Sequence, residues 1–320
     1  MLFNYKAEFA GDVACPSCQS RDVCQLGPIP SSNVFAGRFL DSALPGGFLC
    51  RCLDCSLSFR YPRPSRPDVD ELYRMGDKES WPEPVGGRTD WKLISKMLQS
   101  LSGIKRVLDV GCFDGRFLEY LGQGYEWFGV EIHKVAAESA RQRGVSIIAE
   151  DYSELSSHQI KVDAVLAVDV IEHSYDPREF LACLVSAVRE DGIIIITTGN
   201  TNAPTWRLMG SRYWYCHIAE HMSFINPEWA QNVAQRLGLD LIAIERFSHN
   251  EDDKFSHRLH EIFSNLVYRV SLKLFSGLRR LGGGGIDVKR YPELLDVPPY
   301  WISARDHMLI VFKKRSPQPS

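Results

Sequence analysis

The segment that decides the fold is Val107-Leu108-Asp109-Val110-Gly111-Cys112-Phe113-Asp114-Gly115-Arg116-Phe117-Leu118. A short apolar run, which we interpret as a buried strand, leads into a loop, and a helix begins at Arg116. Gly111 and Gly115 allow the backbone to approach a ligand closely at the carboxyl end of the strand. The dinucleotide fingerprint G-x-G-x-x-G is absent, because only these two glycines are present. The loop therefore predicts a cofactor site without a pyrophosphate signature.

Strands alternate with helices on both sides of this loop. Single helices between strands imply right-handed crossovers, so the pattern predicts an α/β fold with a doubly wound, mostly parallel, seven-stranded sheet. The strands are expected at 105–110, 127–131, 145–148, 162–168, 193–198, 239–247 and 307–312. The helices between them are expected at 116–121, 135–143, 177–189 and 226–237.

The composition excludes several classes of protein. The chain has 320 residues, of which 44% are hydrophobic and 24% charged, so it can bury a core. With 37 Lys and Arg against 40 Asp and Glu, there is no cationic excess for an extended nucleic-acid surface. The N-terminus lacks a secretory pattern, and no run approaches the roughly 20 apolar residues that cross a bilayer. We therefore expect a soluble cytoplasmic protein.

The cysteines predict a metal site near the N-terminus. Six of the nine cysteines lie in the first 55 residues, and two C-x-x-C pairs are separated by 33 residues. Four thiolates at this spacing can close tetrahedrally around Zn²⁺. The predicted ligands are Cys15, Cys18, Cys52 and Cys55. Cys24 and Cys50 are interpreted as core residues, with Cys50 as an alternative ligand if the register of the pairs is looser. Residues 1–60 are interpreted as a small zinc ribbon.

The rest of the chain divides at its prolines. Five prolines between 61 and 90 predict a linker, and 91–320 is expected to form the main domain, with a helical insertion at about 250–305. Within it, 258–281 has apolar residues at helical spacing and a basic opposite face. This helix is interpreted as a lid, a dimer surface, an interfacial helix in peripheral contact with anionic lipid, or a core-packed helix with a solvated basic face.

Acidic residues follow the predicted strands in a fixed order. Glu131 ends the second strand, Asp151 follows the third, and Asp169 leads into Glu172-His173 after the fourth. Together with the glycine loop, this ordered set over about 104–248 resembles the class I S-adenosylmethionine-dependent methyltransferases, which have a Rossmann-like fold.

The resemblance implies a role for each cofactor residue. Asp109, Gly111 and Gly115 would surround the methionine part of S-adenosylmethionine, and Asp169 would lie near its methionine end. Glu131 would accept hydrogen bonds from both ribose hydroxyls, and Asp151 would face the adenine amino group. On the residues alone, Glu131 can also be an exposed strand end and Asp151 a helix cap.

The zinc module before the methyltransferase domain resembles the deoxysugar C-methyltransferases and their relatives. Glu220-His221 is similar to the Glu-His pair of the sugar methyltransferases, in which the histidine is the proposed base. This resemblance implies methyl transfer to an oxygen or activated carbon of a small molecule, a carbohydrate or related metabolite. A lipid-linked glycan is one such acceptor, and His221 and Glu220 are the expected catalytic residues.

Two other functions stay open at this point. Zinc knuckles also bind RNA, so an RNA methyltransferase is an alternative, although the net charge of −3 opposes it. A non-catalytic scaffold that binds the cofactor is the other alternative, with Phe113, where many family members have glycine, as a sign of decay. His217 to His221 also fits the H-x-x-E-H string of inverted zinc proteases, which the surrounding methyltransferase framework disfavours.

Overall fold

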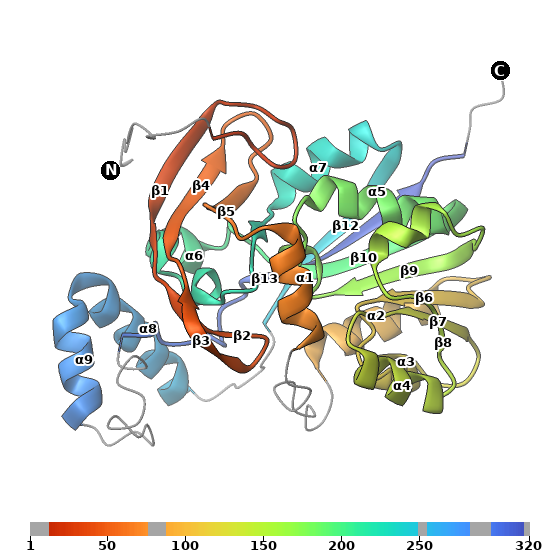
Figure 1. Cartoon of the computed structure of the whole chain (residues 1–320). Coiled ribbons are helices and arrows are strands. Elements are labelled where there is room, and N and C mark those ends of the chain that lie inside the picture. The colour runs from red at the N-terminus through yellow and green to blue at the C-terminus, as the bar shows by residue number, and fades with distance from the viewer. Residues whose placement is uncertain (1–12, 76–87, 249–254, 282–295, 317–320) are drawn as a thin grey trace.

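The computed structural model describes residues 13–75, 88–248, 255–281 and 296–316, and Figure 1 draws the other residues in grey. A large twisted sheet with helices on both faces occupies one part of the molecule, and a smaller sheet from the N-terminal residues lies beside it (Figure 1). Parts of the predicted linker and insertion lie outside the described residues, namely 76–87, 249–254 and 282–295.

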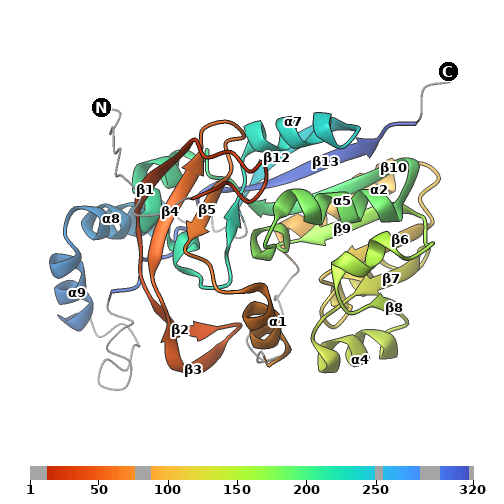
Figure 2. The ribbon, with the colours of Figure 1, turned by 45° about the horizontal axis from the view of Figure 1, so that its top comes forward.

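The large sheet confirms the predicted seven-stranded, mostly parallel arrangement. Its strand order is β12-β13-β10-β9-β6-β7-β8. β13 runs antiparallel to both of its neighbours, and the other paired strands are parallel (Figure 2). The strands are β6 (Arg106–Val110), β7 (Glu126–Val130), β8 (Ser146–Ala149), β9 (Val162–Val168), β10 (Val188–Gly199), β12 (Leu239–Phe247) and β13 (His307–Lys314). The continuous isoleucine run in β10 is buried, as expected of a strand that helices cover on both faces.

Helices cover both faces of this sheet, and side-chain caps define where two of them begin. Asp176 accepts hydrogen bonds from two backbone amides at the start of α5, and Asn226 accepts one from Trp229 at the start of α7. In both helices proline follows the cap, at a position where its missing amide hydrogen costs nothing. The helices are α2 (Thr89–Ser100), α3 (Arg116–Leu121), α4 (Lys134–Gln142), α5 (Pro177–Ala187) and α7 (Pro227–Arg236), with short turns η2 (Tyr152–Ser156) and η3 (Ile171–His173).

The small sheet joins the N-terminal residues to the large domain. Its strand order is β1-β4-β5-β11, and β11 (Ser223–Phe224) comes from far beyond the predicted module boundary at residue 60. The other strands are β1 (Val23–Ile29), β4 (Gly47–Cys52) and β5 (Ser58–Tyr61), and β2 (Ser32–Phe35) and β3 (Arg38–Leu44) form a hairpin. Leu57 and Phe59 belong to the same buried cluster as Trp229 of α7, so the two sheets share a core.

Within the predicted linker the chain forms a helix, α1 (Arg66–Arg74). Ser65 caps it, and Pro67 lies in its first turn. Further along, three short elements follow β10: α6 (Pro204–Met209), η4 (Gly210–Arg212) and η5 (Trp214–His217).

The single helix predicted at 258–281 is instead two helices, α8 (Phe255–Val270) and α9 (Leu272–Leu281). The break falls at Ser271, whose hydroxyl accepts a hydrogen bond from the amide of Leu274 and so caps the second helix. None of the helices in the described ranges combines the length and the hydrophobicity that a bilayer crossing requires.

Candidate active site

A cavity of about 490 Å³ opens at the carboxyl ends of the parallel strands β6, β7 and β9. This edge of the sheet is where ligands bind in doubly wound folds. The loops that follow β6 to β9 line one side of the cavity, and α1 with the beginning of α2 lines the other. The cavity contains five of the six predicted cofactor residues, namely Asp109, Gly111, Glu131, Asp151 and Asp169.

The two glycines of the loop after β6 have different roles. Gly111 has a φ of +77°, and a Cβ there would lie 2.6 Å from Val170 Cγ2. Gly115 also has a positive φ, +81°, but it does not line the cavity, and a Cβ there would lie 3.2 Å from the Cα of Ala140 in α4. Gly115 therefore permits close packing between the loop and α4. The role beside the cofactor that the resemblance implied for it stays a prediction.

Glu131 is fixed by the backbone amides around it. Its carboxylate accepts hydrogen bonds from the amide of Phe113 at 2.8 Å and from the amide of His133 at 2.7 Å. Burial raises the pKa of this carboxyl group, while the two amide hydrogen bonds oppose that shift. Each carboxylate oxygen has two lone pairs, so both oxygens can accept one further hydrogen bond from a ligand in the cavity.

Asp109 carries the observation that best fits a missing cofactor. Its Oδ1 is buried and has no hydrogen-bond partner among the described residues. Burial and the nearby charge of Glu131 both raise the pKa of the Asp109 carboxyl group well above its usual value. Because a buried polar atom without a partner is costly, a donor group on a ligand in this cavity would stabilise the site.

Asp151 is both a cavity residue and a helix cap. Its side chain accepts a hydrogen bond from the amide of Ser153 and forms a capping box with Glu154 at the start of η2. The guanidinium group of Arg66, in the first turn of α1, lies 3.6 Å from its carboxylate. The cap that the sequence offered as the alternative is therefore present, and it holds Asp151 at the cavity wall.

The other end of α1 brings two titratable side chains together. The hydroxyl of Tyr73 lies 2.6 Å from Nδ1 of His173, and both side chains line the cavity. Burial lowers the pKa of His173 to about 4, so its ring is neutral near pH 7. Burial and the charges of Glu220 and Glu172 raise the pKa of Tyr73 well above 10. The neutral ring can therefore accept the Tyr73 proton in a hydrogen bond.

Neither predicted catalytic residue lines this cavity. The side chain of His221 is 5% exposed, its Nδ1 bonds to the carbonyl oxygen of Tyr215, and its ring centre lies 4.9 Å from that of His173. Burial and the neighbouring His173 lower the pKa of His221 well below its usual value. The carboxylate of Glu220 accepts a hydrogen bond from the amide of Ala36 in the small sheet's hairpin region. His221 therefore packs against the cavity histidine.

Behind the cavity, Glu172, His173 and His221 each place one potential metal-ligating atom within 4.8 Å of the others. Existing hydrogen bonds already engage these groups. Glu172 accepts from the hydroxyls of Tyr215 and Thr198, in addition to the contacts of the two histidines given above. Burial raises the pKa of Glu172 to about 7. The cluster thus supports the position of His173 from behind.

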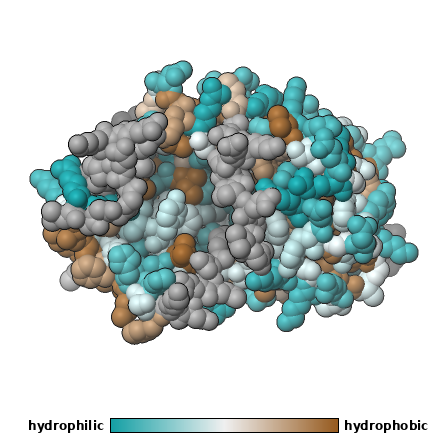
Figure 3. Space-filling view, turned by 90° about the horizontal axis from the view of Figure 1, so that it is seen from below, coloured by the Kyte–Doolittle hydropathy of each residue, from teal (hydrophilic) through white to brown (hydrophobic). Residues whose placement is uncertain are grey.

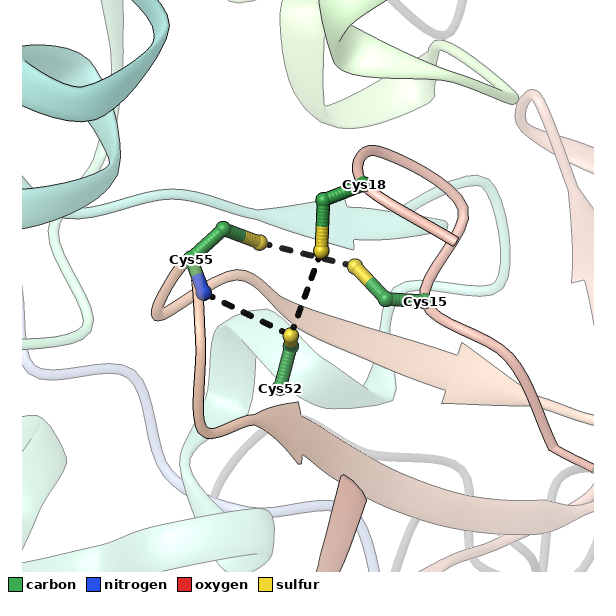
Figure 4. A group of neighbouring side chains, drawn as sticks. All are labelled: Cys15, Cys18, Cys52 and Cys55. Atoms are coloured by element: carbon green, nitrogen blue, oxygen red, sulfur yellow. Dashed lines mark hydrogen bonds between the residues drawn. The ribbon is translucent and has the colours of Figure 1, made fainter. Parts of the chain in front are cut away.

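The four predicted metal ligands lie together, as Figure 4 shows. Their sulfur atoms are all within 4.8 Å of one another, and Cys15 to Cys55 and Cys18 to Cys52 are both 3.5 Å apart. Tetrahedral zinc with bonds of about 2.3 Å places its sulfurs at roughly this separation. Four thiolates without an open position are the donor set of a structural zinc site, so these residues fit the ion.

The cysteine cluster is attached to the large domain by side-chain contacts. Nε1 of Trp229 in α7 donates to the hydroxyl of Ser17, which lies between Cys15 and Cys18. On β5, Arg60 donates to the carbonyl oxygens of Cys216, Ile218 and His221. The small sheet therefore fixes the loop that supports His173.

The sequence did not indicate Tyr73, Arg88 and Trp91 as cavity residues. Tyr73 lies in the predicted linker, and so does Arg88, which forms an ion pair with the buried Asp90 and with Asp169. Trp91 lines the cavity next to them and packs on Phe117. No pattern in the sequence indicated which face of α1 meets the sheet.

Comparison with known proteins agrees with this geometry. Residues 88–244 match the family described as "Methyltransferase domain". The chain is 28% identical over 162 residues to a ubiquinone biosynthesis O-methyltransferase of Thiobacillus denitrificans, a match that covers 46% of this chain and 69% of that protein. A protein of the same description from Bordetella avium is 27% identical over 197 residues, covering 55% of this chain and 80% of that one.

A solved S-adenosylmethionine-dependent methyltransferase from Archaeoglobus fulgidus is also similar, with 22% identity and a TM-score of 0.46 over 78% of this chain and 100% of that chain. The match to the methyltransferase family begins at α2 and ends in β12, and so spans the strands and loops after β6 to β9 that line the cavity. Residues 88–244 therefore form a methyltransferase domain, and the chain is an S-adenosylmethionine-dependent methyltransferase.

Proposed function

We propose that the enzyme methylates a hydroxyl oxygen of a small molecule, with Tyr73 and His173 as the pair that removes the acceptor's proton. One observation carries this proposal: the Tyr73 hydroxyl and the His173 ring form a 2.6 Å contact on the wall of the cavity that also contains Glu131. The sequence predicted His221 as the residue that removes this proton. Its burial behind His173 favours a supporting role instead.

We expect the cofactor to lie along the loops after β6, β7 and β8. Glu131 would bind the ribose hydroxyls with the lone pairs that its two amide contacts leave free. Asp109 would accept a hydrogen bond from the methionine part, which would give its buried Oδ1 a partner. When bound, S-adenosylmethionine supplies a methyl group on a sulfonium, which needs little further activation.

The protein must align the acceptor oxygen with the methyl group and remove the acceptor's proton. As the acceptor oxygen bonds to the methyl carbon, its proton passes to the Tyr73 oxygen, and the Tyr73 proton passes to Nδ1 of His173. His173 is neutral near pH 7 because burial lowers its pKa to about 4, so it is in the state that accepts a proton. Bound S-adenosylmethionine would supply the methyl group and would keep the electrons of the carbon–sulfur bond on its sulfur.

The acceptor is proposed from two sources. The matched relatives are named O-methyltransferases, which supports oxygen over carbon as the methylated atom. The zinc module's resemblance to the deoxysugar C-methyltransferases supports a carbohydrate acceptor, whereas the relatives' name refers to ubiquinone biosynthesis and supports a phenolic one. The cysteine cluster is proposed to hold a structural Zn²⁺ ion and to take no part in the reaction.

The test is methyl transfer from labelled S-adenosylmethionine to a panel of phenols, catechols and sugar nucleotides. With the best acceptor, Tyr73→Phe should lower kcat about a hundredfold and leave the Kd for S-adenosylmethionine unchanged. Tyr175→Phe is the matched control, because that tyrosine also lines the cavity but donates its hydroxyl to Pro64. Equal kcat values for the two variants would refute the role of Tyr73, and a product methylated on carbon would refute the proposed acceptor atom.

A further inference from the structure

Helices α8 and α9 project from the end of the molecule that lies away from the large sheet, as Figures 1 and 2 show. They begin after β12 and play no part in the cavity. Apolar side chains gather at this end in the space-filling view of Figure 3. The two helices carry exposed large apolar residues along their length: Phe255, Leu259, Ile262, Phe263, Leu266, Val270, Leu272, Leu274 and Leu278.

Helix α8 differs from an ordinary surface helix in what it buries. Its inward face carries polar groups beside Val267 and Tyr268: the carboxylate of Glu261 accepts hydrogen bonds from the amides of Ile302 and Ser303, and Asn265 is fully buried. Its outward face is apolar, and Phe263 and Val270 are 62% and 83% exposed. A surface helix in water normally directs its apolar stripe toward the core. This arrangement therefore indicates a partner surface that covers the apolar side.

Contacts on the inward side hold the helices in this orientation. The hydroxyl of Tyr268 donates to the carbonyl oxygen of Asp296, and Arg279 donates to the carbonyl oxygen of Val297. Arg212, in η4, donates to the carbonyl oxygen of Arg269. Tyr268 and Phe275 also pack into a buried cluster beside the aromatic residues of α6 and η5. The apolar face is thus presented outward by a specific set of contacts.

The charge of α8 and α9 indicates which kind of partner covers their apolar face. Residues 255–281 contain five Lys and Arg and one Asp or Glu, while the whole chain has a net charge of −3. That single acidic residue, Glu261, is engaged on the inward side. A second copy of the same face would bring two positive surfaces together, whereas anionic lipid headgroups would attract them. We propose that the outward apolar face of α8, with the basic side chains of α8 and α9, docks in the plane of an anionic membrane surface.

The experiment measures how much of the full-length chain sediments with vesicles. We expect binding to vesicles of equal parts phosphatidylglycerol and phosphatidylcholine, and little binding to phosphatidylcholine alone. Phe263→Ser with Val270→Ser should lower the ratio of bound to free protein about tenfold or more, because two apolar side chains no longer insert. The control is Phe39→Ser with Ile242→Ser, which removes two exposed apolar side chains from β3 and β12 and should bind as the unaltered chain does.

A second pair of variants tests the charge. Lys273→Gln with Arg280→Gln should weaken binding to the anionic vesicles roughly tenfold, while Lys92→Gln with Lys96→Gln, on the exposed side of α2, should not. Unchanged affinity of all variants for S-adenosylmethionine shows that they fold. Failure of the unaltered chain to bind anionic vesicles would overturn the proposal. So would a dimer in sedimentation velocity that only the Phe263 and Val270 variant abolishes, because the face would then pair with its own copy.

Discussion

The two sides of the cavity are built in different ways. The proposed cofactor side comes from consecutive strand-to-helix loops, in which Gly111, Glu131, Asp151 and Asp169 follow one another in chain order. The proposed acceptor side joins Tyr73 to His173, which lie 100 residues apart, and depends on the small sheet for support. A motif read along the chain finds the first kind of site, while the second kind arises only when distant segments pack together.

Removal of the proposed zinc ion should have the largest effect, because it should abolish methyl transfer and leave the binding of S-adenosylmethionine intact. Cys52→Ser should lose the metal and lower Tm by at least about 6 °C, since metal binding contributes directly to the stability of such modules. Because Arg60 and β11 depend on the small sheet, methyl transfer should disappear while S-adenosylmethionine still binds. Metal content, Tm and calorimetric titration check this.

Cys24→Ser is the matched control, because Cys24 lies on β1 outside the cluster. It should keep its metal and its turnover. If Cys52→Ser lost the metal but kept full turnover, the acceptor side would not depend on the small sheet.

Replacement of the proposed base should have the next largest effect. His173→Asn keeps a polar side chain near Tyr73 but cannot take up a proton, so kcat should fall about a hundredfold with little change in the Kd for S-adenosylmethionine. In the unaltered enzyme, kcat/KM should stay nearly constant from pH 8 to 5 and fall below that, because the His173 pKa is lowered to about 4. A fall centred near pH 6.5 would show instead that an ordinary, solvated histidine controls the rate.

The smallest effect concerns stability and the buried His221. Its pKa is lowered in the folded state, so the unfolded chain binds more protons, and stability is lost as pH falls below about 6.5. His221→Gln removes this proton, and its unfolding free energy should decline less steeply, by up to about 1.4 kcal/mol per pH unit. Urea unfolding at pH 7 and 5.5 measures the difference.

The control for this titration is His260→Gln, on the exposed side of α8, which should follow the pH dependence of the unaltered chain. The same slope for His221→Gln and the unaltered chain would mean that His221 is accessible to protons in the folded state.

The seven-stranded sheet was predictable because its signals are local. The apolar strand at 162–168 lies at the predicted residues, and Asn226 and Pro227 begin a helix as their capping chemistry requires. The glycine loop was predicted for the same reason, and Gly115 within it packs on α4. A glycine that permits close packing of a helix and a glycine that permits close approach of a ligand look the same in the sequence.

The remaining features depend on packing between distant segments. β11, which begins at residue 223, completes the small sheet by pairing with β5. A strand of two residues leaves no recognisable pattern in the sequence. His221 follows a Glu-His pattern, yet β5 and Tyr215 fix it behind His173. The segment 258–281 has a clear apolar stripe in the sequence. Contacts of Glu261 and Asn265 determine which side of α8 faces the protein.

The claim on which the account depends is that the cavity binds S-adenosylmethionine through the carboxylate of Glu131. Its most direct test is calorimetric titration of the unaltered chain and of Glu131→Ala, with Glu126→Ala, at the exposed start of the same strand, as the control. We predict one site per chain and a Kd about a hundredfold weaker in Glu131→Ala alone, from the loss of two charge-assisted hydrogen bonds. Equal affinity in a Glu131→Ala protein that retains its Tm would contradict the account.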